Sequence, residues 1–159
     1  MIKYLKTDDS RCVGCMNCTA TCSKKYFKQD NPALSCIAVH GLGKGAFHLV
    51  ACDQECRICV VECPTKAISV ARAGIVVINK GLCVGCLACV AVCPIEAMMW
   101  YPGGNSPFKC IACGDCVETC PKEALAIAEK VESSASRFPF EVEAAASRTA
   151  PSKAARIAR

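Results

Sequence analysis

The sequence lacks the features of membrane-spanning, secreted and nucleotide-binding proteins. Its 159 residues contain no apolar run of roughly 18 or more, so it predicts no membrane-spanning helix. The chain begins with MIKYLKTDDS, which is charged and has no apolar stretch, so we expect no secretory signal and a cytoplasmic location. It also lacks a dinucleotide-binding fingerprint and a nucleophile paired with a base. We therefore expect a protein that is not itself an enzyme.

Aromatic residues are scarce, at 6% of the chain, whereas cysteine is abundant, with 17 residues. All but one of the cysteines fall into four quartets, and the last three quartets end in Cys-Pro. The quartets are Cys12, Cys15, Cys18 and Cys22; Cys52, Cys56, Cys59 and Cys63; Cys83, Cys86, Cys89 and Cys93; and Cys110, Cys113, Cys116 and Cys120. Such a chain is expected to be cross-linked by what its thiols bind and to fold poorly without it.

The spacing of the quartets is typical of bacterial ferredoxins, whose C-x2-C-x2-C-x3-C-P run binds [4Fe–4S] clusters. Three close thiolates hold one cluster, and the fourth thiolate reaches across to another. Zinc favours paired C-x2-C units, and a disulfide framework suits a secreted chain, so both alternatives are weaker. The sequence therefore predicts four [4Fe–4S] clusters, with the cysteines of the four quartets as iron ligands.

The formal net charge of +5 counts every cysteine as neutral. Each oxidised cluster with four thiolates carries about −2, so four clusters bring the protein to about −3. The positive charge of the bare sequence is therefore no indication of nucleic-acid binding, and we predict none. The lysines and arginines are expected to offset buried cluster charge or to meet acidic partners.

The predicted fold is α+β, with tandem ferredoxin-like units in which short hairpins and helices surround the clusters. A short helix is expected to run into each Cys-Pro. Residues 1–130 are predicted to form the four-cluster domain, and residues 131–159 an extended tail that is disordered or docks on a partner. The glycines between the first two strands predict a hairpin turn rather than a phosphate-binding loop. The predicted strands are Leu34–His40, Phe47–Ala51, Ala67–Arg72, Gly74–Asn79, Ala97–Tyr101 and Ala124–Ala128.

Three segments next to the cysteines are typical of one protein family. They are Asn31-Pro32-Ala33-Leu34-Ser35, Phe108-Lys109-Cys110, and Val117-Glu118-Thr119-Cys120-Pro121-Lys122-Glu123-Ala124-Leu125. The order of elements over residues 8–130 resembles the four-cluster ferredoxin-like electron-transfer subunits of molybdenum and tungsten oxidoreductases, formate dehydrogenases and some hydrogenases. The small size looks most like the small iron–sulfur subunit of a bacterial tungsten aldehyde oxidoreductase.

The resemblance also implies how the quartets combine. Quartets one and four form one ferredoxin-like unit, and quartets two and three form the other. The implied ligand sets are Cys12, Cys15, Cys18 with Cys120; Cys110, Cys113, Cys116 with Cys22; Cys52, Cys56, Cys59 with Cys93; and Cys83, Cys86, Cys89 with Cys63. Sequential pairing, of quartet one with two and of three with four, is the alternative.

Two quartets depart from the regular pattern. Cys22 is followed by Ser23 instead of proline, and three residues instead of two separate Cys52 from Cys56. Cys56 is therefore the least secure ligand, although no other nearby cysteine can replace it. Cys36 lies outside every quartet and is interpreted as a buried strand thiol.

Four other residues invite functional interpretation. Both histidines, His40 and His48, are interpreted as ordinary strand or loop residues, because Rieske ligation requires a quartet that lacks cysteines. Trp100 and Tyr101 follow the third quartet, where core packing is a simpler role than shielding a cluster or meeting a partner.

The predicted function is to relay single electrons through four clusters, because all recognisable chemistry lies in the quartets. The resemblance implies a large catalytic subunit with a tungsten or molybdenum pterin, which oxidises aldehyde or formate, as one partner. The other partner is a flavin subunit that reduces NAD, or a ferredoxin, and self-association through residues 131–159 is left open. The alternative is a free, soluble polyferredoxin shuttle.

Overall fold

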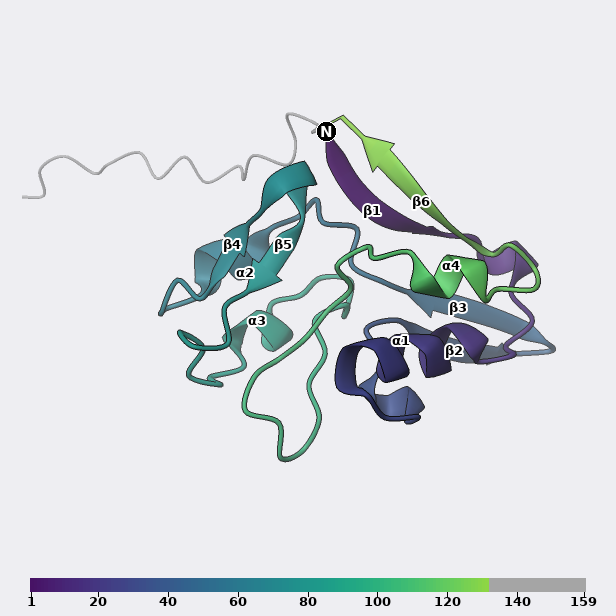
Figure 1. The fold of residues 1–159 in the computed structure, drawn as a ribbon, viewed down its shortest axis with the longest axis horizontal. Helices are drawn as coiled ribbons and strands as arrows, with labels where there is room; N and C mark the ends of the chain where they lie inside the picture. The colour runs from purple at the N-terminus through teal and green to yellow at the C-terminus, as the bar shows by residue number, and fades with distance from the viewer. Residues whose placement is uncertain (132–159) are drawn as a thin grey trace, which may run out of the picture.

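The computed structural model describes residues 1–131. Within them, short strands form three two-stranded antiparallel sheets, accompanied by four α-helices (Figure 1). The strands are β1 (Ile2–Thr7), β2 (Ala38–Gly43), β3 (Ala46–Val50), β4 (Ile68–Val70), β5 (Val76–Ile78) and β6 (Leu125–Lys130), and the helices are α1 (Asn17–Phe27), α2 (Ile58–Glu62), α3 (Ala88–Ala91) and α4 (Asp115–Glu118). None of these helices has the length and apolar composition needed to cross a bilayer. The predicted tail lies almost entirely outside the described residues.

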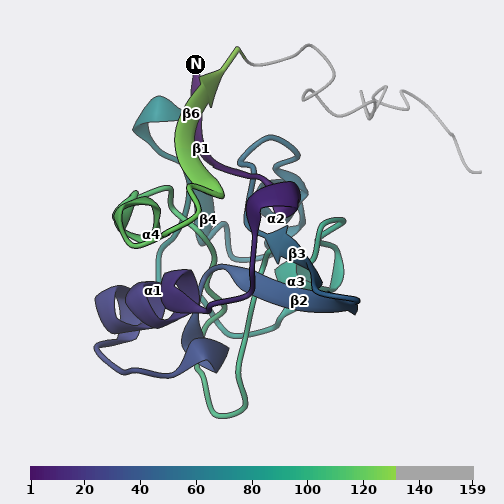
Figure 2. The ribbon, with the colours of Figure 1, turned by 90° about the vertical axis from the view of Figure 1, so that its right-hand side faces the viewer.

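The described chain folds as two halves, one made by its middle and the other by its two ends. Strand β1 pairs with β6 and helix α1 packs against α4, so the two ends of the described chain meet (Figures 1 and 2). In the other half, on the left of Figure 1, β4 pairs with β5 and α2 packs against α3. This nested order agrees with the pairing of quartets that the family resemblance implies.

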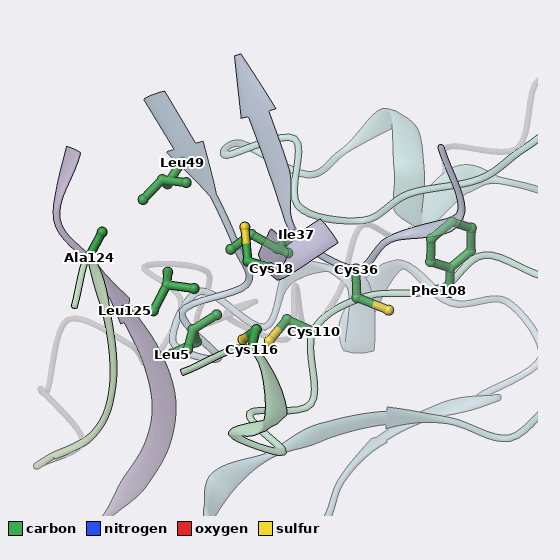
Figure 3. Packing of buried hydrophobic residues seen from close by; sticks show 10 residues of the cluster. All are labelled: Leu5, Cys18, Cys36, Ile37, Leu49, Phe108, Cys110, Cys116, Ala124 and Leu125. Carbon is green, nitrogen blue, oxygen red and sulfur yellow. The ribbon is translucent and has the colours of Figure 1, made fainter. Parts of the chain in front are cut away.

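Each half has a hydrophobic core that mixes cysteines with aliphatic side chains. The first core consists of Leu5, Cys18, Cys36, Ile37, Leu49, Phe108, Cys110, Cys116, Ala124 and Leu125. The second consists of Cys63, Ala67, Ile68, Val76, Cys89 and Met98. Figure 3 shows the cysteine sulfurs of the first core among its aliphatic side chains. Because thiols occupy core positions, whatever they bind becomes part of the core.

The structure confirms both predicted hairpins but corrects one strand. The hairpins are β2–β3 and β4–β5, with bounds shifted by a few residues. The strand predicted at Ala97–Tyr101 is wrong, because only Met99 pairs there, in an isolated bridge with Phe108. Pro102 and Pro107 lie close to these two residues in the chain, and proline has no N–H with which to extend a ladder. Strand β1 is not among the predicted strands, since its partner lies at the far end of the described chain.

Helix α1 is longer than the other helices because Ser23, rather than proline, follows Cys22. Helices α2, α3 and α4 stop before a Cys-Pro, whereas α1 runs through Cys22 to Phe27 and has 11 residues in all. The buried Ser23 hydroxyl donates to a backbone carbonyl of α1 at 3.0 Å and accepts the Asn31 N–H at 3.2 Å. The last turn places the Phe27 ring edge-on to Phe108, with the ring centroids 4.8 Å apart. The absent proline thus allows an aromatic contact between the first quartet's helix and the approach to the fourth quartet.

Candidate iron–sulfur centre

The structure brings all the predicted cysteine ligands together in four sets. Each set joins three cysteines of one quartet to the last cysteine of another. The sets are A (Cys12, Cys15, Cys18, Cys120), B (Cys22, Cys110, Cys113, Cys116), C (Cys52, Cys56, Cys59, Cys93) and D (Cys63, Cys83, Cys86, Cys89). This grouping has the nested pattern and differs from sequential pairing.

Three of the sets line cavities. The cavity of set B has a volume of about 220 Å³ and is also lined by Tyr26 and Cys36. Set A lines a smaller cavity together with Val39 and Leu49. Set C lines another small cavity together with Val76 and Met98 of the second core. In set D, the thiols of the other three cysteines lie close enough to Cys89 to raise its pKa.

The same backbone turn positions the thiols in all four quartets. The residue after the second cysteine has a positive φ and directly precedes the helix, so that the third cysteine lies in the first helical turn. These residues are Met16 (φ 61°), Arg57 (φ 50°), Leu87 (φ 59°) and Gly114 (φ 97°). The turn reverses the loop, and the loop and the helix then present three thiols to one cavity.

Backbone amides donate hydrogen bonds to the last cysteine of three quartets. The donors are the N–H groups of Cys36 to Cys22 Sγ (3.3 Å), Ala97 to Cys93 Sγ (3.3 Å) and Ala124 to Cys120 Sγ (3.4 Å). Hydrogen bonds to ligand sulfurs stabilise negative charge and are one of the factors that set the reduction potential of an iron–sulfur cluster. The sulfurs contributed across quartets are therefore oriented by the backbone as well as by the cavity.

Burial raises the pKa of the thiols at the centres of the sets. Burial, together with neighbouring thiols, raises the pKa of Cys18 to about 11 and that of Cys59 to about 12. The pKa of Cys89 is raised to about 11 for the same reasons. Without iron these thiols are protonated at neutral pH. Iron binding must release their protons, and the iron then compensates the buried negative charge.

The four sets lie in the order A, B, C, D. At each junction, the pKa of one cysteine is raised by a cysteine of the adjacent set. This effect is smaller than those of burial and of the thiols in its own set. The pairs across the junctions are Cys18 with Cys116, Cys52 with Cys110, and Cys89 with Cys59. The junction of B with C is also the junction of the two halves of the fold.

The wider first gap of quartet two accommodates Gln54, whose side chain is buried and links the two halves. Its amide nitrogen donates to the carbonyl oxygens of Cys110 at 2.8 Å and Cys52 at 3.3 Å. Its amide oxygen accepts the Val76 N–H at 3.0 Å and the Lys109 ammonium at 2.7 Å. The sequence pattern gives no role for Gln54 or Lys109, although the irregular gap of quartet two was a signal for Gln54. The extra residue therefore makes room for a side chain that bridges the two halves. Cys56 still lies with Cys52, Cys59 and Cys93 in set C.

Cys36 stands outside the four sets but lines the cavity of set B. It is buried, as predicted, and lies just before β2 rather than within it. Its thiol donates a hydrogen bond to Cys22. That bond, opposed by burial, is the main reason why the pKa of Cys22 is lowered to about 6. Cys36 therefore supports a member of set B.

The two histidines and the Trp100–Tyr101 pair lie outside the four sets. His48 contacts Asp9, with 2.6 Å between Nδ1 and Oδ2, and His40 is its exposed cross-strand neighbour. The core role predicted for Trp100 is wrong, because the residue is 39% exposed. The core role predicted for Tyr101 is confirmed, because its ring packs edge-on against helix α1.

The four sets fit [4Fe–4S] clusters in the chemistry of their donors. Each set offers four sulfur ligands, and thiolate sulfur is the ligand that binds such clusters in proteins. The cavities of sets A, B and C are largely apolar and partly enclosed by the cores, which limits access of water to a bound cluster. The donor set and its surroundings therefore agree with the sequence motif.

Replacing Gly85 by alanine is expected to disturb set D. Gly85 lies between Cys83 and Cys86 with φ +67°, and a Cβ there would lie 2.9 Å from the backbone oxygen of Asn105. We expect Gly85→Ala to lower iron content and to reduce the free energy of unfolding by about 1–3 kcal/mol more than the control does. The control is Gly43→Ala, which has a similar φ of +84° but no atom within 4 Å of its Cβ. Equal effects of the two substitutions, measured by iron assay and anaerobic urea titration, contradict the prediction.

Family models for iron–sulfur domains match the regions that contain all four quartets. Two models, each described as a 4Fe-4S dicluster domain, match residues 51–97 and 75–121. A model described as a 4Fe-4S binding domain matches residues 9–25. The matches therefore include the irregular second quartet and the first quartet, which lacks its proline.

Known proteins with related sequences include subunits of reductases. The chain is similar to the B subunit of the polysulfide reductase of Wolinella succinogenes, with 37% identity over 110 residues, which are 64% of this sequence and 58% of that one. It is also similar to thiosulfate reductase electron transfer subunit PhsB of Salmonella typhi, with 33% identity over 105 residues, covering 60% and 54%. Among solved structures, the chain aligns with one from the active site complex BamBC of benzoyl coenzyme A reductase with 1,5 dienoyl-CoA. The TM-score is 0.47 and the identity 23%, and the alignment covers 89% of this chain and 85% of that one. The chain spans about half the length of the curated relatives it matches.

The cofactor follows from two independent observations. The fold gathers cysteines of separate quartets into four sets, and the family models assign 4Fe-4S binding to the same segments. This chain therefore binds several [4Fe–4S] clusters, in segments that match 4Fe-4S dicluster and 4Fe-4S binding domains.

Proposed function

We propose that this chain is an electron-transfer subunit that relays single electrons through four [4Fe–4S] clusters. Sets A to D are the proposed ligands, with one cluster for each set. Bound [4Fe–4S] clusters accept and release one electron at a time. The observation that carries the proposal is the unbroken order of the sets, in which a cysteine of each set lies near enough to a cysteine of the next to affect its pKa. No second chemistry competes with this role at the site.

The two ends of this order are accessible from solvent. Cys15 in set A and Cys86 in set D are exposed, as is Cys113 in set B. Apolar side chains stand beside the two terminal sets, with Val13 50% and Val84 68% exposed. Apolar surface around an exposed ligand favours docking of a partner that excludes water. The terminal sets are therefore the proposed points at which electrons enter and leave.

The proposed main partner is a large catalytic oxidoreductase subunit, with a tungsten or molybdenum pterin as its cofactor. Oxidation of aldehyde or formate is the reaction that the family resemblance implies for that subunit, whereas the relatives named above are subunits of polysulfide and thiosulfate reductases. We therefore propose an oxidoreductase subunit of this class as the partner. A flavin subunit that reduces NAD, or a ferredoxin, is the proposed partner at the other end.

Anaerobic affinity purification of the full chain from its native cells tests this function. The chain is expected to elute with a much larger subunit that contains tungsten or molybdenum. Substrate of that subunit should then reduce the iron–sulfur signals seen by EPR. The isolated chain should be reduced by dithionite but should neither oxidise aldehyde nor reduce NAD.

Two outcomes contradict the proposal. Elution of the chain alone with its full iron content favours the free polyferredoxin shuttle. Turnover of aldehyde or NAD by the pure chain shows that the chain is itself an enzyme.

A further inference from the structure

We propose that Lys109 is a buried cation that raises the reduction potentials of the clusters held by sets B and C. The inference rests on the proposed function, because it assumes a cluster in each of these sets. It assigns a tuning role to a residue that is not a ligand.

The burial of Lys109 leaves its charge without an acidic partner in the protein. The residue is only 2% exposed, and its ammonium donates to Gln54 Oε1 at 2.7 Å and to the Cys110 carbonyl at 3.0 Å. Both acceptors are neutral, and none of the ion pairs formed within residues 1–131 includes Lys109. A buried charge without a counter-charge is costly. The compensating negative charge must therefore come from another group nearby.

The position of Lys109 identifies that group. Its side chain lines the cavity of set C, and Lys109 directly precedes Cys110 of set B. Its ammonium donates to the Cys110 carbonyl, which belongs to a ligand of set B, while its side chain lines the cavity that set C would fill with a cluster. The compensating negative charge is thus that of the clusters bound in these two sets, with their deprotonated thiolates.

Gln54 fixes the ammonium at this junction. The same amide oxygen that accepts from Lys109 also accepts the Val76 N–H at 3.0 Å, so the oxygen cannot turn away without breaking a buried backbone hydrogen bond. The amide nitrogen is held by the Cys110 carbonyl at 2.8 Å. Lys109 therefore has one defined place between sets B and C.

A fixed cation at this place favours the reduced clusters. Reduction adds one electron to a cluster that already carries about −2, and no bond or proton has to change. The attraction between the cation and the cluster grows with that added charge, and it is screened less in the interior than in water. Lys109 thus makes it easier for an electron to reside at the junction of the two halves.

The test is an EPR-monitored redox titration of the full holo-chain, with a reduced viologen dye as electron donor. In Lys109→Met, two of the clusters should show at least a tenfold shift toward the oxidised form at a fixed potential, which is about 59 mV for one electron. Lys109→Arg keeps the charge and should remain near the wild type. Lys44→Met removes an exposed charge from the β2–β3 turn and should have no effect.

Iron and sulfide assays on each variant separate loss of a cluster from a change in its reduction potential. Loss of iron in Lys109→Met but not in Lys109→Arg supports the proposal, because it shows that the cation is needed to hold the clusters. Full iron with unshifted potentials in Lys109→Met overturns it, as does equal behaviour of the Met and Arg variants. An iron-free wild-type chain instead contradicts the proposed function, so the two failures are distinguishable.

Discussion

Removing iron from the purified protein is expected to abolish its fold. The described chain has only two-stranded sheets, which are marginally stable in isolation, and both of its cores contain cysteines. Cluster binding therefore contributes directly to the free energy of folding. We expect loss of the whole free energy of unfolding, about 5–15 kcal/mol for a typical domain. Anaerobic chelation followed by far-UV circular dichroism and urea titration measures it.

The matched control is Cys36→Ser. Cys36 is not a ligand, and serine keeps a hydroxyl that can donate to Cys22 in place of the thiol, so this variant should keep the wild-type content of about sixteen iron and sixteen sulfide per chain, four of each per cluster. It should unfold cooperatively before chelation and not after it. Iron near eight per chain, or stoichiometric zinc, contradicts the four-cluster proposal. A chelated chain that still unfolds cooperatively contradicts the role of the clusters in folding.

The features that could be predicted from the sequence are those encoded locally. The spacing of each quartet is set by a short loop and the first turn of a helix, so the cysteines that the structure gathers are those the motif indicated. The two hairpins have strands separated by short, turn-forming segments, which also allowed them to be predicted. Even the departures had local signals, since the absent proline after Cys22 coincides with the extension of α1.

The features that could not be predicted depend on contacts between distant segments. Strand β1 is defined by its pairing with β6, in which Ile2 lies opposite Lys130. The strand wrongly predicted at Ala97–Tyr101 is a short apolar run, but within residues 1–131 its only ladder pairing is the bridge from Met99 to Phe108. From the sequence, Lys109 is an ordinary surface charge next to a cysteine. Its burial depends on the fold, which places Gln54 from another quartet against it. Local patterns thus reveal the ligands, whereas the fold determines which groups surround them.

Replacing Cys120 by serine is expected to affect the cluster held by the first quartet. Cys120 closes the fourth quartet in sequence, but in the structure its thiol belongs to set A, where burial, Cys15, Cys12 and Cys120 itself raise the pKa of Cys18. Loss of one ligand should remove up to about four of the sixteen iron atoms and alter one EPR signal. Sequential pairing instead assigns Cys120 to the cluster of the third quartet.

Double variants separate these two arrangements, because substitutions in one cluster are not additive, whereas those in independent clusters are. Cys120→Ser combined with Cys15→Ser should lose little more iron than the more damaging single variant, because both residues belong to set A. Cys120→Ser combined with Cys86→Ser should lose the sum of the two single losses, because Cys86 belongs to set D. The opposite result, additive with Cys15 and non-additive with Cys86, requires sequential pairing. Iron assay of anaerobically purified variants gives this result without the catalytic partner, so it tests the ligand sets separately from the proposed function.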